Sequence, residues 1–151
     1  MKAFGKTSLV RLSSCTKYLE QVCMEAVERC PYTDPITGLT VPDLIIICGH
    51  RTEAEQQAAF DNYMSKVQWP NSRHNTFPSE AVDIGPYIAD LPGHIPWSNK
   101  AIWKAQHNLI MTVANELHIP LRSGIDWDRD GVLVDDDPDE SFWDAPHYEE
   151  I

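Results

Sequence analysis

The chain has 151 residues, 42% of them hydrophobic and 23% charged, a composition typical of one globular domain rather than of a disordered segment. Its formal net charge is -11 and no stretch predicts a basic face, which argues against nucleic-acid binding. No apolar run approaches the length of a membrane span, and no hydrophobic stretch follows the basic residues at the start. We therefore expect a single domain over residues 1–151 that folds in a cytoplasm without membrane insertion.

The cysteines show no paired spacing. Cys15, Cys23, Cys30 and Cys48 stand singly, without a CxxC motif. Because we expect folding in a reducing compartment, we predict reduced and mostly buried thiols rather than disulfides.

The N-terminal half is predicted to contain two helices and one buried strand. Apolar residues recur at helical spacing over 8–29, and Pro31 follows the expected end of that helix. The face expected to be buried consists of Leu12, Leu19, Val22, Cys23, Ala26 and Val27. The apolar run 43–48 is typical of a buried strand. A capping-box pattern predicts a helix over 53–66, and the polar, turn-rich stretch 67–80 is predicted to be a loop.

The C-terminal half mixes strands with one long helix. Residues 81–84 are predicted to form a strand that carries an acid on one face, and 86–97, with three prolines, to be irregular. Ser98 is expected to cap a helix that runs to about His118. Its inward face is expected to comprise Ile102, Ala105, Leu109, Val113 and Leu117. Short strands are expected at 121–122 and at 147–151, the latter at a sheet edge.

These elements follow one another without a repeating βαβ rhythm. Such an order favours an α+β domain, in which a small and mainly antiparallel sheet is flanked by helices. In that architecture, residues on strand ends and loops can meet although they lie far apart in the sequence.

Two histidines and two aspartates form the main candidate site. His74, Asp83 and His147 offer three ligands, the number that a catalytic zinc ion takes while one position is left for water. Calcium and magnesium prefer all-oxygen ligand shells and fit this set less well. Asp144 precedes His147 by one helical-turn spacing and is placed to act as general base and then general acid. Spacing alone leaves open that these are unrelated polar residues.

The remaining histidines are weaker candidates for metal ligands. His107 and His118 fall on the predicted long helix, and His94 falls in the proline-rich loop. Surface or capping positions are expected for these three. We assign no role to His50.

An acidic segment near the C-terminus predicts a second ion site. Between residues 126 and 150 the chain has eleven acidic residues and one basic residue. The segment begins like an EF-hand calcium loop, with acids at positions 1, 3 and 5 and glycine at position 6. The expected ligands are the side chains of Asp126, Asp128, Asp130 and Asp137 and the carbonyl of Val132, with Asp135 or Asp136 as substitutes for Asp137. The alternative is a solvated acidic turn, although mutual repulsion of the carboxylates favours a bound cation.

Several motifs occur together, in one order, over nearly the whole chain. They are Ser-x-His at 72–74, Ala-x-Asp at 81–83 and Asp-x-Pro-His-Tyr-Glu at 144–149, together with matching stretches at 4–8, 49–56 and 124–127. This set resembles the zinc peptidases that cut bacterial cell-wall peptides. That family includes D-alanyl-D-alanine carboxypeptidases and bacteriophage L-alanyl-D-glutamate endopeptidases. The resemblance implies the fold of the zinc DD-peptidase and hedgehog-like domains.

The resemblance also implies roles for particular residues. It makes His74, Asp83 and His147 the zinc ligands and Asp144 the catalytic acid and base. Arg51 would hold a substrate carboxylate or steady the oxyanion, with a structural salt bridge as the alternative.

Two neighbouring features of the first ligand motif concern the substrate. Ser72 would lie on the substrate side of the site. The stretch 75–80 makes the gap between His74 and Asp83 longer than is usual in the family, which bears on substrate fit more than on metal binding.

The short chain, without a separate wall-binding domain, most resembles phage endolysins. The expected function is hydrolysis of the L-alanyl-D-glutamate bond in peptidoglycan stem peptides during host lysis, an antimicrobial activity. We expect a monomer, made in the host cytoplasm, that reaches the wall with the help of a holin. Calcium is expected to order 126–137 and so to position the last zinc ligand and the base. The alternatives are a D-alanyl-D-alanine carboxypeptidase of the same family and a non-catalytic wall-binding or virion protein.

Overall fold

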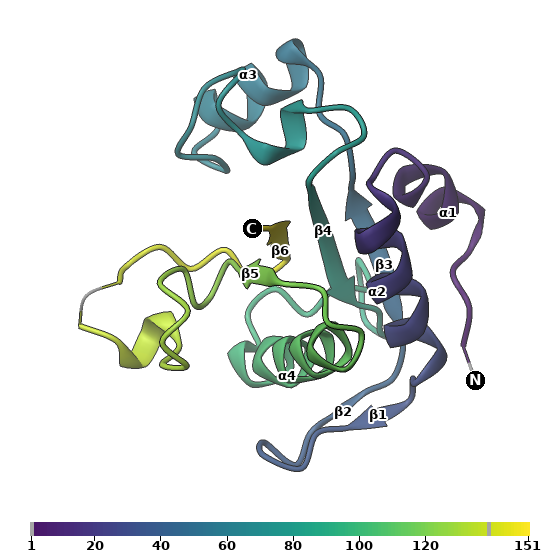
Figure 1. Ribbon diagram of the computed structural model, residues 1–151. Coiled ribbons are helices and arrows are strands. Elements are labelled where there is room, and N and C mark those ends of the chain that lie inside the picture. The colour runs from purple at the N-terminus through teal and green to yellow at the C-terminus, as the bar shows by residue number, and fades with distance from the viewer. Residues whose placement is uncertain (1, 139) are drawn as a thin grey trace.

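A four-stranded antiparallel sheet forms the centre of the molecule. The computed structural model describes residues 2–138 and 140–151. The strands run in the spatial order β3 (Leu44–Cys48), β4 (Ala81–Pro86), β6 (His147–Glu150) and β5 (Leu121–Ser123) (Figure 1). Every neighbouring pair is antiparallel. The predicted α+β architecture with a small antiparallel sheet is confirmed.

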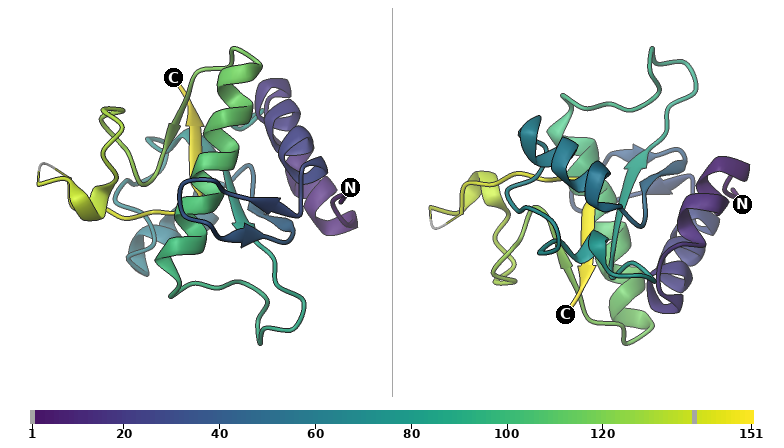
Figure 2. Two further views of the ribbon diagram at one scale, coloured as in Figure 1. Left: turned by 90° about the horizontal axis from the view of Figure 1, so that it is seen from below. Right: turned by 90° about the horizontal axis from the view of Figure 1, so that it is seen from above.

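Helices flank this sheet. The remaining elements are α1 (Lys6–Leu12), α2 (Lys17–Glu28), α3 (Glu53–Asp61), α4 (Lys100–Glu116), the 3-10 turns η1 (Arg73–Asn75) and η2 (Val134–Asp136), and a hairpin of β1 (Tyr32–Thr33) and β2 (Thr40–Val41). Helix α4 packs on β4 and β5 with α2 beside it, whereas α1 packs against β3 (Figure 2). Helix α3 stands apart, above the start of β4 (Figure 1). Among the described residues, no helix has both the length and the apolar character that a bilayer span needs.

The alternation of side chains along the strands separates a core face from a polar face. Val82 and Tyr148 are opposite each other in the β4–β6 ladder, are fully buried, and belong to the apolar core beneath α4. Their neighbours Asp83 and His147 form the next pair and therefore point to the opposite face. The alternation of side chains along the two strands thus places Asp83 and His147 together, on the face of the sheet away from the core.

The single helix predicted over 8–29 is wrong in one respect, because the structure has two helices there. The chain turns between Leu12 and Lys17, where the Thr16 side chain accepts a hydrogen bond from the Leu19 amide and caps α2. The Thr16 amide itself donates to the carbonyl of Ser79. The predicted apolar face is nevertheless buried in full, since both helices turn it toward the core.

The helix predicted over 53–66 ends earlier, at Asp61. Its capping box at Thr52 and Glu55 is present as predicted. Asn62 ends the helix by donating its side-chain amide to the Ala58 carbonyl, and Tyr63 adopts a left-handed backbone with φ of 60°. An α-helix cannot continue through that conformation.

Other boundaries also differ from the predictions. The long helix is capped by Asn99 rather than Ser98, and Leu117, predicted to face inward, is 42% exposed beyond its end. The hairpin of β1 and β2 was not predicted, because strands of two residues leave no periodic signal. The loop predicted over 67–80 contains the 3-10 turn η1.

The last strand is internal and not at the edge, contrary to the prediction. β6 pairs with β4 on one side and with β5 on the other, so the edges of the sheet are β3 and β5. The chain ends inside the sheet because β5 is added outside β6. The four cysteines are free and three of them are buried, as predicted.

The docking of α1 on the edge strand β3 depends on a buried hydroxyl. The Ile46 amide donates to Ser8 Oγ over 3.0 Å. Replacing Ser8 with alanine leaves this buried donor unpaired, which costs roughly 1–3 kcal/mol. We expect S8A to lower the urea midpoint without changing the slope, whereas S13A, at an exposed serine of the same segment, leaves it unchanged. Equal midpoints for S8A and S13A would contradict this account.

Candidate metal centre and cleft

Three side-chain atoms from distant parts of the chain converge at one point on the polar face. His74 Nε2 lies 3.2 Å from Asp83 Oδ1 and 3.2 Å from His147 Nδ1. His147 Nδ1 lies 3.5 Å from the same Asp83 oxygen. Tetrahedral ligands with bonds of about 2.0–2.1 Å lie about 3.3 Å from one another. The three predicted ligands therefore have the mutual spacing that a zinc-sized ion requires.

The second nitrogen of each imidazole is already bonded, which fixes the ring and its tautomer. His74 Nδ1 donates to the carbonyl of Gly49 over 2.7 Å. His147 Nε2 lies 2.8 Å from Glu149 Oε1. The nitrogens that face Asp83 are therefore the ones left to bind a metal ion in place of a proton.

Local structure places each ligand. Asp83 and His147 are opposed in the β4–β6 ladder. His74 lies in η1, which is capped by Ser72, whose hydroxyl accepts a hydrogen bond from the His74 amide over 3.2 Å. Ser72 also lines the cleft described below, so its capping role is visible and its predicted contact with substrate stays a prediction.

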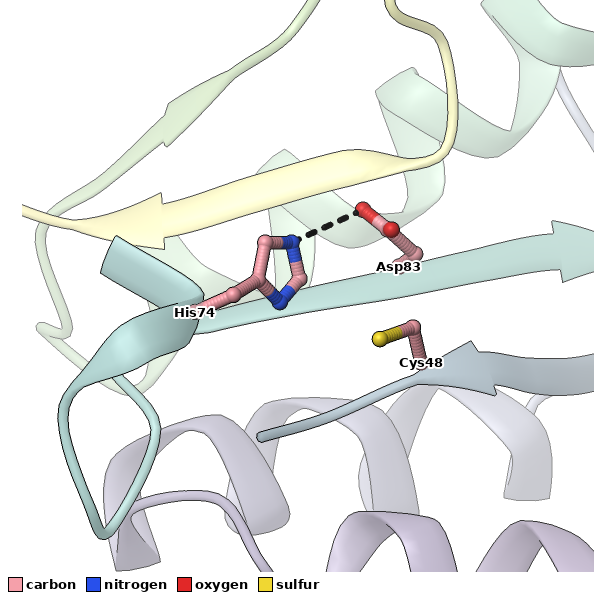
Figure 3. A group of neighbouring side chains, drawn as sticks. All are labelled: Cys48, His74 and Asp83. Atoms are coloured by element: carbon pink, nitrogen blue, oxygen red, sulfur yellow. Dashed lines mark hydrogen bonds and ion pairs between the residues drawn. The ribbon is translucent and has the colours of Figure 1, made fainter. Parts of the chain in front are cut away.

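A fourth possible donor lies beside this group. Cys48 is opposite Asp83 in the β3–β4 ladder, after a bulge in β3. The ligand atoms of Cys48, His74 and Asp83 all lie within 4.8 Å of one another. Figure 3 shows the Asp83 carboxylate at one edge of the His74 ring and the Cys48 sulfur on the β3 side. The sequence offered no signal for this thiol, which extends the donors available to a metal.

The electrostatics of the metal-free site favour a cation. Burial by itself would lower the pKa of His74, but the charge and hydrogen bond of Asp83 outweigh it and raise this pKa to about 10. Burial likewise opposes the charge on Asp83, yet the two histidines hold the pKa of Asp83 well below its usual range. A carboxylate that retains protons on its neighbouring imidazoles would also attract a divalent ion, which displaces those protons.

Asp144 lies beside the three ligands, where its backbone closely approaches the backbone of Gly124. Its amide donates to the Gly124 carbonyl over 2.8 Å, and the Gly124 amide donates to the carbonyl of His147 over 2.7 Å. A side chain at position 124 would meet the Asp144 carbonyl oxygen at 1.9 Å, so only glycine fits there. Burial and the charge of Asp83 raise the pKa of Asp144 to about 6, which suits a group that first accepts and then donates a proton.

Arg51 is held against the metal ligands rather than free in the cleft. Its Nη2 donates to Asp83 Oδ2 over 3.1 Å, and its Nη1 donates to Gln56 Oε1 over 2.9 Å. Gln56 is fully buried at the base of α3. The salt bridge considered as an alternative for Arg51 is therefore present, and the substrate contact expected from the resemblance stays a prediction.

The ligands lie in a cleft of about 870 Å³. One wall is α3 and the segment that follows it, and the opposite wall is the segment before His147. Aromatic rings and exposed apolar side chains line both walls, namely Tyr63, Met64, Trp97, Trp127, Phe142 and Trp143. This volume fits several residues of an extended peptide.

The predicted calcium loop brings its acids together. Carboxylate oxygens of Asp128, Asp130 and Asp137 lie within 4.8 Å of one another, as do those of Asp126, Asp128 and Glu140. Glu140 lies beyond the expected twelve-residue frame, and sequence reasoning missed it. The Val132 amide donates to Asp130 Oδ1 over 2.8 Å, and the carbonyl of Val132 stays a predicted ligand.

The two substitutes expected for Asp137 lie outside these clusters. Asp135 forms a salt bridge with Lys104 of α4 over 2.8 Å, and Asp136 belongs to neither cluster of acids. Asp126 Oδ1 and Glu140 Oε2 are buried with no hydrogen-bond partner among the described residues. Desolvation and the charges of Asp130 and Glu140 raise the pKa of Asp128 to about 6. Asp126 and Glu140 thus place buried oxygens that are unpaired within the described part of the chain beside the exposed carboxylate of Asp128, and the mutual repulsion of these acids favours a nearby cation.

One prediction about the other histidines is wrong. His107 is buried, not at the surface, and its Nδ1 lies 2.8 Å from the Ser123 hydroxyl. Burial lowers the pKa of His107 to about 4, so the ring is neutral and links α4 to β5. His118 and His94 are exposed, as predicted.

An open set of two imidazoles and one carboxylate, with a further carboxylate beside it on a cleft floor, is typical of hydrolases that use a divalent metal ion. Over residues 1–151 the sequence matches the family described as phage L-alanyl-D-glutamate peptidase, and the chain belongs to that family. It is 31% identical over 134 residues to the L-alanyl-D-glutamate peptidase of Escherichia phage T5, a match that covers 88% of this chain and 87% of that protein.

A solved structure agrees at the level of fold. The crystal structure of the Serratia marcescens L-Ala D-Glu endopeptidase ChiX is similar with a TM-score of 0.69 at 19% sequence identity. The match covers 99% of this chain and 91% of that one. The family inferred from the motifs is therefore confirmed, and so is the type of fold.

Glu149 is a residue of the matching motif to which the sequence alone assigned no role. It receives the Nε2–H of His147 and is itself held by Arg73 and Arg122, at 3.5 and 3.3 Å. These charges lower the pKa of Glu149 although burial opposes them. A carboxylate behind a metal-binding histidine orients the ring and raises its basicity.

Replacing Glu149 with glutamine keeps the shape but removes the charge. We expect E149Q to weaken divalent metal binding roughly 10- to 100-fold, as measured by competition with a chromophoric chelator. E150Q, one residue along β6 and on its other face, serves as the control and should bind as wild type does. Unchanged metal affinity in E149Q would show that Glu149 does not tune the ligand.

Proposed function

We propose that this protein hydrolyses the amide between L-alanine and D-glutamate in peptidoglycan stem peptides, with a zinc ion held by His74, Asp83 and His147. The family supplies the substrate class. The observation that carries the zinc assignment is the spacing of the three donor atoms, at 3.2, 3.2 and 3.5 Å. A borderline-soft ion that prefers nitrogen and oxygen ligands in a tetrahedron suits this set.

The side chains divide the work of the reaction between them. When bound, zinc supplies Lewis-acid activation of a water molecule and of the scissile carbonyl. Asp144 accepts the proton of the attacking water and passes it to the leaving amine, which its raised pKa near 6 permits. Arg51 keeps Asp83 oriented and offers its remaining N–H groups to the developing oxyanion.

A D-alanyl-D-alanine carboxypeptidase is the nearest alternative. Such an enzyme must bind a free C-terminal carboxylate at the end of its cleft, whereas an endopeptidase needs a cleft open along the peptide. The match to the family of phage L-alanyl-D-glutamate peptidases favours the endopeptidase. Digestion of intact sacculi and of a free pentapeptide, read by mass spectrometry, separates the two activities.

The setting of this activity also belongs to the proposal. The protein would act as a monomeric endolysin, made in the host cytoplasm and released to the wall by a holin. A non-catalytic wall-binding role is disfavoured because both the ligands and Asp144 are in place around one point.

Asp144 can be tested separately from the metal. We expect D144N to lose roughly 10²- to 10⁴-fold in kcat, the share that a general acid–base contributes. Because Asp144 is not among the three ligands, the variant should still hold about one zinc per chain by elemental analysis, and a chelator should abolish the wild-type activity. D90N, in an exposed loop, is the matched control. Wild-type lysis of sacculi by D144N would remove Asp144 from the mechanism.

Calcium forms the second part of the proposal. The acids of 126–140 would hold one calcium ion and thereby order the segment that ends in Asp144. Support comes from the two clusters of carboxylates and from the buried, unpartnered oxygens of Asp126 and Glu140 among the described residues. Low cytosolic calcium would then keep the enzyme weak until it reaches the cell envelope.

The double variant D126A/D128A tests the role of this loop. We expect wild-type activity to rise with calcium by roughly 5- to 150-fold, the range of typical coupling energies, and the double variant to stay low and indifferent to calcium. Hydrolysis rates in calcium–EGTA buffers measure this, with D136A as control because Asp136 lies outside both clusters. Identical calcium profiles for wild type and double variant would reject the regulatory role.

A further inference from the structure

The bond assigned above has a negative charge next to it. In stem peptides, D-glutamate continues the chain through its γ-carboxyl group, so its α-carboxylate stays free beside the amide nitrogen that leaves. The protein has a formal net charge of -11, and its cleft contains Glu55, Asp144 and Glu149. Repulsion would oppose binding of this substrate unless a cation of the cleft meets the α-carboxylate.

Three cationic side chains line the cleft, and two are already neutralised. Arg51 is paired with Asp83. Arg73 is shared between Glu80 and Glu149. Lys66 also lines the cleft, and no carboxylate of the described residues lies within salt-bridge distance of it. The positive charge still available to a ligand is therefore that of Lys66.

The position of Lys66 is fixed by aromatic contacts that lead to the site. Its Nζ lies 4.5 Å from the centre of the Phe142 ring, which belongs to the opposite wall. Phe142 stacks on Trp127 with ring centres 5.8 Å apart, and Trp127 lies 5.4 Å from the His147 ring. An ammonium on a ring face keeps N–H donors free for an anion. Phe142 is two residues before Asp144, so Lys66 contacts the segment that carries the proposed acid and base.

We propose that Lys66 is the specificity determinant that binds the free α-carboxylate of D-glutamate in the scissile dipeptide. The inference rests on the proposed function and adds a subsite to it. The subsite would distinguish stem peptides with a free α-carboxylate from those in which that group is amidated. The leaving half of the substrate would thus be bound to Lys66 through one charge-assisted hydrogen bond.

Two synthetic muramyl peptides that differ at one group test this proposal. One contains D-glutamate with its free α-carboxylate, and the other contains the α-carboxamide. We expect wild-type kcat/KM to be roughly 10- to 100-fold higher for the carboxylate. K66Q should lose that preference by raising KM for the carboxylate while it leaves the carboxamide unchanged, and K66R should restore part of it. Zinc content should remain at the wild-type level in all variants.

Lys100 provides a matched control. Its Nζ lies 4.8 Å from the ring centre of Trp143, next to Phe142, but Lys100 does not line the cleft. K100Q should therefore keep the wild-type preference. Equal losses of K66Q on both substrates, or a wild-type enzyme indifferent to amidation, would overturn the role of Lys66. A wild-type enzyme that cuts neither peptide would overturn the proposed function itself, and this inference with it.

Discussion

The pairing of Asp83 with His147 across two adjacent strands is the constraint on which the site depends. The two residues meet because the last strand inserts between β4 and β5, and alternation turns both away from the core. η1 then brings His74 over the pair. A buried carboxylate between two imidazoles is stable only with a proton or a metal ion among them, because desolvation penalises the bare charge. Folding of this end of the sheet and capture of a cation are therefore linked.

A second layer of charges holds the ligands in place and connects the same strands. Arg73 bridges Glu80, the residue just before β4, and Glu149, on β6. Arg122 of β5 reaches Glu149 from the other side. The carboxylate of Glu149 thus has three partners, His147, Arg73 and Arg122, which compensates the cost of its burial. The ring of His147 is oriented by the same contacts that keep the three strands in register.

Much of this could be predicted from the sequence, and the misses have identifiable physical reasons. His74, Asp83 and His147 were found because imidazole and carboxylate are limited ligand types and the motifs around them were specific. The pattern over 8–29 did not show the break at Thr16, because both helices bury one continuous apolar stripe. The order of the strands in the sheet could not be predicted, since no pattern in residues 147–151 indicates which strands pair with β6.

Second-layer residues were missed for a related reason. Glu149 and Glu140 are two of many acidic residues in their segment. Only the folded structure shows which of these carboxylates contacts a ligand and which lies in solvent. His107 was expected at the surface because histidine is polar. The helical pattern of apolar residues in α4 does not show that one of its histidines is buried and neutral. Its partner Ser123 lies on a strand of three residues, too short to predict its contacts.

The acidic segment leaves the sheet after β5 and returns to it at β6, and backbone hydrogen bonds join its two ends at the site. Gly124 joins both Asp144 and His147 through backbone hydrogen bonds. Farther out, Trp127 Nε1 donates to the Phe142 carbonyl over 2.8 Å. His147 has additional restraints in the β-ladder and in Glu149, whereas Asp144, at the end of the acidic segment, is held by backbone hydrogen bonds to Gly124 and His147. If the loop binds calcium as proposed, the ion would therefore act on the placement of Asp144 more than on zinc affinity.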